Sequence, residues 1–84
     1  MKIPTKQFSE VLPLVECYIM YHDLEASTAK GAGFVQATVG SRRQARHIKE
    51  FLQKRVEHKA IQKDGMFEIE LDDEGWYCLT INNK

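Results

Sequence analysis

Alternating apolar and polar residues near the C-terminal end predict a β-hairpin. The loop Asp73–Gly75 ends in glycine, which adopts the positive φ that a three-residue hairpin loop needs. This loop sets a register with three apolar cross-strand pairs, and we expect them to form the core face: Leu71 with Tyr77, Ile69 with Leu79 and Phe67 with Ile81. The opposite face would then carry Glu68, Glu70, Asp72, Trp76, Cys78 and Thr80.

A second pattern predicts one long helix over about residues 42–59. Ser41 suits its N-cap, because a serine hydroxyl accepts a hydrogen bond from the first turn. The apolar positions recur at helical spacing and form one stripe, which consists of Ala45, Ile48, Leu52 and Val56, flanked by Phe51. The polar side is rich in cations, so we expect the helix to pack on the sheet and expose a basic face.

The first forty residues give a less regular pattern. Residues 33–39 predict a strand with Phe34, Gln36 and Thr38 on one face, preceded by a small, polar loop at 26–31. Pro13 favours a short helix at about 5–12 that ends before it, followed by an alternating strand at about 14–24. Helical spacing also runs through this segment, so a helix is the alternative there. The prediction is an α+β fold in the order α-β-β-α-β-β, with about four antiparallel strands.

Composition places the chain among small soluble domains. Its 84 residues are enough for one domain, and 43% hydrophobic and 29% charged residues are ordinary globular values. The first residues lack the apolar segment of a secretory signal, and no apolar run reaches the length of a membrane span. We therefore expect a cytoplasmic protein in which Cys17 and Cys78 are free thiols that act as small hydrophobic residues.

A net charge of zero conceals a strong segregation of charge. Residues 41–59 carry seven cations against two anions, whereas residues 60–84 carry six anions against two cations. Three of the cations, Arg42, Arg43 and Arg46, open the predicted helix, where they oppose its dipole, and Lys49 follows one turn later. A basic face of this kind attracts polyanions even on a neutral protein.

The residue types needed for catalysis or metal binding do not form a recognisable pattern. The two cysteines and three histidines lack the spacing of a metal site, and His47 and His58 would lie about 16 Å apart along the helix at ~1.5 Å per residue. The carboxylates of the hairpin would lie on a convex, solvated surface rather than in a cleft. We therefore expect a protein that is not an enzyme and needs no cofactor or metal.

One segment resembles a known nucleic-acid-binding motif. The eight residues Lys30-Gly31-Ala32-Gly33-Phe34-Val35-Gln36-Ala37 are similar to the RNP1 strand of RNA-recognition-motif domains. The resemblance implies that Phe34 stacks a base and that Lys30 lies near phosphates. It is partial: Ala32 and Ala37 stand where the family has aromatic residues, and the chain is not a complete domain of that family.

These observations lead to two hypotheses. The first is a non-catalytic module that binds nucleic acid, RNA rather than DNA, through Arg42, Arg43, Arg46 and Lys49, assisted by Lys30 and Phe34. The second is a small regulator or inhibitor of the viral or plasmid type that binds a host protein. It would use either the basic helix or the acidic hairpin face, which carries Trp76, Glu68, Glu70 and Asp72. In either case a homodimer could form through an open sheet edge.

Overall fold

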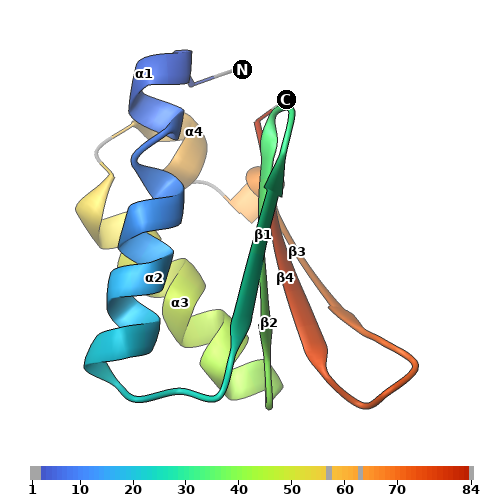
Figure 1. Ribbon diagram of the computed structural model, residues 1–84. Helices are drawn as coiled ribbons and strands as arrows, with labels where there is room; N and C mark the ends of the chain where they lie inside the picture. Colours follow the sequence, from blue (N-terminus) through green and yellow to red (C-terminus); the bar gives the residue numbers. More distant parts are fainter. Residues whose placement is uncertain (1–2, 57, 63, 84) are drawn as a thin grey trace.

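Helices cover one face of a four-stranded antiparallel sheet in the computed structural model and leave the other face open (Figure 1). The structure describes residues 3–56, 58–62 and 64–83. The helical elements are α1 (Thr5–Phe8), α2 (Val11–Tyr21), α3 (Arg42–Arg55), α4 (Lys59–Gln62) and the short 3-10 helix η1 (Asp64–Met66). The strands are β1 (Ser27–Gly31), β2 (Phe34–Val39), β3 (Phe67–Leu71) and β4 (Tyr77–Asn82). The predicted α+β class and its element order are confirmed.

The sheet joins two hairpins through its central strands. Its strand order is β1-β2-β4-β3, so β1 and β3 are the edges and β2 pairs with β4 in the middle. Each hairpin follows its own helix along the chain: α2 precedes β1 and β2, and α3 precedes β3 and β4. The fold therefore repeats the order helix–strand–strand twice.

The N-terminal segment is helical where a strand was predicted. The chain forms α1 and then α2, so the strand expected at about 14–24 is wrong, and the helix expected at about 5–12 is divided between the two elements. Pro13 does not end a helix here, because it lies in the first turn of α2, where its missing N–H would have no intrahelical partner. Val11 and Val15 of α2 are fully buried.

The segment expected to be a loop at 26–31 forms the edge strand β1. Its residues are small and almost all exposed, so no alternation of apolar residues indicates a strand. Pairing with β2 decides its structure: Ser27 lies opposite Thr38 and Gly31 lies opposite Phe34. Gly33 makes the turn between the two strands with a φ of 78°.

Helix α3 begins as predicted and ends earlier. The Ser41 hydroxyl accepts the N–H of Gln44 at 3.2 Å, which confirms the N-cap. The helix ends at Arg55 because Val56 adopts an extended conformation, with a φ of −100°. This bend directs the chain into α4, where Ile61 is fully buried. The predicted apolar stripe is confirmed, with Ala45, Ile48, Leu52 and Val56 buried and Phe51 half-buried.

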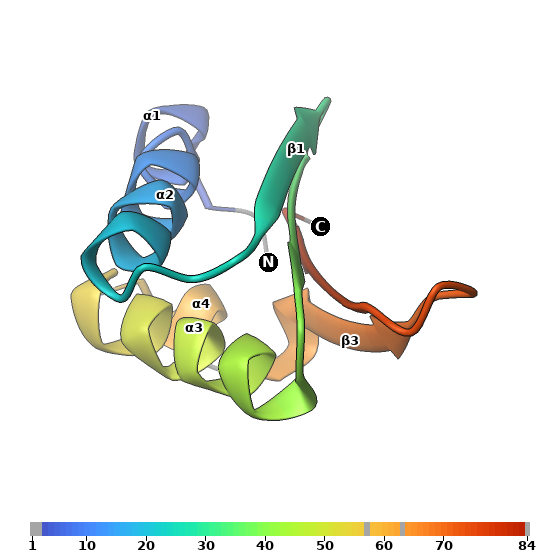
Figure 2. The same cartoon turned by 60° about the horizontal axis from the view of Figure 1, so that its bottom comes forward.

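The C-terminal hairpin has the predicted register and loop. Gly75 has a φ of 89°, as its place in the loop requires. The three predicted pairs are confirmed, namely Leu71 with Tyr77, Ile69 with Leu79 and Phe67 with Ile81. Burial along the core face is uneven, however, since Leu79 and Ile81 are fully buried and Leu71 is 58% exposed. The β3–β4 hairpin extends beyond the helices (Figure 2), in agreement with the high exposure of Leu71 at the end of β3.

The two cysteines carry free thiols at different depths. Cys78 is half-buried on β4, whereas Cys17 is exposed on α2 and so does not act as the small hydrophobic residue that we expected. Within the described residues, no helix combines the length and the apolar composition needed to cross a membrane.

Candidate functional site

The outer side of α3 exposes part of the predicted basic cluster. Ala45, Ile48 and Leu52 are fully buried and fix the orientation of the helix. Arg43 and Arg46 lie on the side opposite this stripe and are exposed. Within the described part of the chain, neither arginine forms an ion pair. Their guanidinium groups are therefore available to an anionic partner.

The other two predicted helix cations are held by the protein itself. The guanidinium carbon of Arg42 lies 5.4 Å from the centroid of the Tyr77 ring, a cation–π geometry that positions this side chain at the start of α3. Lys49 is half-buried and takes part in an interaction within the chain. The four predicted residues thus divide into two that are exposed and unpaired and two that are engaged.

Phe34 and Lys30 do not join the surface of α3. Phe34 lies on the open face of the sheet, opposite the helices, and its ring covers Gly31 so closely that a side chain would not fit there. Lys30 is exposed on the edge strand β1. The RNP1-like segment is divided between two strands, with Lys30 and Gly31 ending β1 and residues 34–37 in β2. The structure therefore places the predicted stacking residue and the basic helix on opposite sides of the sheet.

The open face of the sheet is acidic and carries the tryptophan. Glu68 and Glu70 are exposed on β3, and their cross-strand partners on β4 are Thr80 and Cys78. None of the helices that the structure describes covers this face (Figure 1). At its end near the hairpin loop lies a pocket of about 300 Å³, lined by Glu25, Ala26, Ser27, Thr38, Asp72, Glu74 and Trp76.

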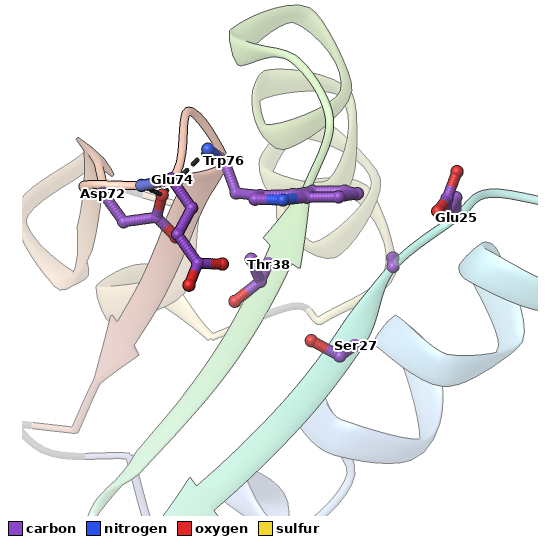
Figure 3. Close-up of a pocket in the computed structure, with 7 residues that line it drawn as sticks. Glu25, Ser27, Thr38, Asp72, Glu74 and Trp76 are labelled. Carbon is purple, nitrogen blue, oxygen red and sulfur yellow. Dashed lines mark hydrogen bonds between the residues drawn. The ribbon is translucent and has the colours of Figure 1, made fainter.

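The Trp76 pocket combines an aromatic wall with carboxylates. Figure 3 shows the indole of Trp76 extending over Thr38, with Glu74 and Asp72 on one side and Glu25 on the other. One carboxylate oxygen of Asp72 accepts the backbone N–H groups of Glu74 and Trp76, each at 2.9 Å, and so fixes the chain around the indole. A ring face beside negative charge is suited to a cationic group.

The two charged surfaces lie on opposite sides of the molecule. Arg43 and Arg46 are exposed on the side of α3 opposite its buried stripe. The acidic residues of β3 lie on the sheet face that the helices leave open. This separation keeps the acidic residues from neutralising the field around Arg43 and Arg46, even though the net charge is zero. The basic surface of α3 can therefore attract an anionic partner, and the acidic face of the sheet can attract a cationic one.

Sequence analysis missed an aromatic groove between α2 and α3. Leu14, Cys17, Tyr18 and Tyr21 line one side of it, and Phe51 and Arg55 line the other. The first four follow the spacing i, i+3, i+4, i+7, which places them on one helix face. The signal was present in the sequence, but the strand predicted at 14–24 divided these residues between two faces.

The described residues contain no group of three or more His, Cys, Asp or Glu side chains that could hold a metal ion. Comparison of the chain with protein-family models, with curated proteins and with solved structures finds no match. The structure offers three surface features: a basic helix, an acidic sheet face with a tryptophan pocket, and an aromatic groove.

Proposed function

We propose that this protein is a non-catalytic module that binds nucleic acid, RNA in preference to DNA, through the outer face of α3. Arg43 and Arg46 contact phosphates directly, because the planar guanidinium group donates two parallel hydrogen bonds to phosphate oxygens. Arg42 contributes charge from its position over Tyr77, and Lys49 borders the same face.

A single observation carries this proposal: two arginines one turn apart are exposed and without an ion pair on a helix that faces away from the acidic surface. A carboxylate three or four residues away on the same helix can pair with an exposed cation and offset its charge. Glu50 follows Arg46 at this spacing on α3, yet the structure shows no ion pair between them. An anion from outside the protein supplies the missing partner.

The preference for RNA rests on the RNP1-like segment. Phe34 and Lys30 lie away from α3, so they assist only a strand that continues around the edge of the sheet past β1. The main affinity is electrostatic and comes from α3, and the contribution of Phe34 is a secondary contact at a distance from it.

The test is binding of a fluorescently labelled single-stranded RNA at several salt concentrations. Each phosphate contact contributes about −0.7 to the slope of log K against log salt. The double variant Arg43→Gln/Arg46→Gln should flatten this slope by about 1.4, and it should fold normally because glutamine is a good helix former. A DNA strand of the same sequence should bind more weakly than the RNA.

Two control variants make the test specific. Arg43→Lys/Arg46→Lys retains the charge and should retain the slope while losing part of the affinity, since lysine lacks the bidentate geometry. Lys6→Gln removes an exposed cation from α1, outside the proposed surface, and should leave binding unchanged. If the glutamine double variant binds as wild type does, α3 is not the nucleic-acid surface.

The Trp76 pocket favours a second candidate function, the docking of a protein that presents an arginine or lysine side chain. Three carboxylates and an indole face line this pocket, and such a surface attracts a cationic side chain and excludes nucleic acid. Trp76 is the only tryptophan in the chain, so its fluorescence reports on this site alone. Titration with an arginine-rich peptide should change that fluorescence, and Glu74→Gln should weaken the effect. An unchanged signal at saturating peptide would exclude this function.

A further inference from the structure

The groove between α2 and α3 is an aromatic site beside the proposed phosphate-binding surface. It has a volume of about 400 Å³, within the range of ligand pockets. One of its walls includes Tyr21, which is 83% exposed although tyrosine is a large, partly apolar side chain. Among the residues that the structure describes, no carboxylate lines the groove, and Arg55 supplies a positive charge.

The rings around the groove form a layered arrangement from both helices. Tyr18 lies 5.0 Å from Phe51 between ring centroids, which joins α2 to α3. It also lies 4.2 Å from His22, and the His22 ring meets Tyr21 edge-on at 5.0 Å. Tyr18 and Phe51 are half-buried, whereas the ring of Tyr21 is exposed beside them and accessible to a ligand.

Arg55 adds a cation at the edge of this aromatic wall. Its guanidinium carbon lies 5.3 Å from the centroid of the Phe51 ring. A ligand that fits the groove therefore has a flat ring for the aromatic side chains and an anionic group for Arg55. A nucleotide within a strand has both.

We propose that this groove stacks an unpaired nucleobase of the nucleic acid bound along α3, with Arg55 contacting a neighbouring phosphate. The inference rests on the proposed function and specifies its ligand as single-stranded. Phe51 and Arg55 belong to the helix that carries Arg43 and Arg46. At ~3.6 residues per turn, Arg43 and Phe51 lie about 80° apart around its axis, so a strand that follows the helix can reach both. At ~1.5 Å per residue, Arg43 and Arg55 lie about 18 Å apart along the axis, a distance that a single strand of several nucleotides can span.

Binding of a single strand and of a duplex distinguishes stacking from charge. A 12-nucleotide single-stranded RNA offers free bases, whereas a duplex of the same length offers only its phosphates to this groove. Tyr21→Ala should weaken binding of the single strand about 5- to 150-fold, the range found for base–aromatic stacking, and leave the salt slope and duplex binding unchanged. Arg55→Gln should instead flatten the slope by about 0.7.

Met20→Ala is the matched control. Met20 lies next to Tyr21 on α2 and is similarly exposed, at 81%, but it does not line the groove. Its substitution should leave affinity unchanged. Both variants should keep the wild-type melting temperature, because neither side chain is buried.

A measurement on the unaltered protein provides a second test. Cys17 is exposed on the wall of the groove, and Cys78 lies on the open face of the sheet. Bound single-stranded RNA should slow alkylation of Cys17 and leave the rate at Cys78 unchanged.

The outcomes separate this inference from the function on which it rests. If the Arg43→Gln/Arg46→Gln variant loses affinity while Tyr21→Ala binds as Met20→Ala does, the groove does not stack a base and the phosphate-binding role of α3 stands. Equal alkylation of Cys17 with and without RNA leads to the same conclusion. If wild-type protein binds neither single strand nor duplex at low salt, both proposals are wrong.

Discussion

The two faces of the sheet differ in what covers them and in what their residues do. On the covered face, Val35, Ala37, Leu79 and Ile81 are buried beneath α2 and α3. On the open face most side chains are polar or acidic, and Phe34 and Trp76 are the aromatic exceptions. A side-chain hydrogen bond from Gln36 to Thr80, at 3.3 Å, joins β2 to β4 on this face. Residues that alternate along the same strand therefore have different roles.

This difference indicates that the covered face provides the stability of the domain, whereas its exposed surfaces are the ones available to partners. The covered face contributes the hydrophobic free energy of folding, and a substitution there acts on the whole domain. The open face and the outer side of α3 contribute little apolar burial, so a substitution there acts on charge and on partners. The comparison can be tested with residues that are neighbours in sequence and lie on opposite faces.

The largest effect is expected at the centre of the covered face. Leu79→Ala should lower the free energy of unfolding by about 2–5 kcal/mol, because it leaves a cavity at a fully buried position. Thr80→Ala, one residue away on the open face, should cost about 1 kcal/mol, the value of its hydrogen bond with Gln36. Urea denaturation of both variants measures the difference. Equal losses would show that the open face is also covered in solution.

A smaller effect is expected at Asp72, where an open-face side chain supports the structure. Its carboxylate accepts two backbone N–H groups in the hairpin loop, so Asp72→Ala should cost about 1–2 kcal/mol. Asp73→Ala is the control, because Asp73 is exposed in the same loop and should change stability by less than about 0.5 kcal/mol. Thermal unfolding compares the two. Similar melting temperatures would indicate that the loop keeps its conformation without the Asp72 contacts.

The smallest effect is expected at Leu71, where the covered face reaches beyond the helices. Leu71 is 58% exposed, so Leu71→Ala should cost about 0.5 kcal/mol, although the residue belongs to the same alternating pattern as Leu79. Chemical denaturation with replicate measurements resolves a change of this size. A loss above about 2 kcal/mol would show that a partner or a second copy covers the hairpin tip.

Sequence patterns predicted the elements whose local signals agree with one another. The hairpin register followed from strict alternation around a loop that ends in Gly75, and the start of α3 followed from Ser41 and the apolar stripe behind it. The basic and acidic segments also proved to lie on opposite sides of the sheet, because charge follows the polar side of each element.

The remaining elements depended on contacts that are distant in sequence. Strand β1 has no apolar alternation and exists because β2 pairs with it. A proline in the middle of a helix breaks it, whereas a proline in the first turn is tolerated. Only the break between α1 and α2 at Ser9 shows that Pro13 is in a first turn. The aromatic groove could not be predicted without the helix at residues 11–21, because its residues face one another only when this helix packs against α3.

The central pair of strands has a kinetic consequence. Strands β2 and β4 are the pair that joins the two helix–strand–strand halves within the described sheet, whereas the other two pairs join neighbours in the chain. Formation of this pair closes a long loop, and contacts of high sequence separation are slow to form. Substitutions at Ala37 and Leu79, which lie opposite each other there, should therefore slow folding. Substitutions at the tip of the β3–β4 hairpin should mainly accelerate unfolding. The folding rate of this protein is therefore set by the pairing of β2 with β4, where its two halves meet.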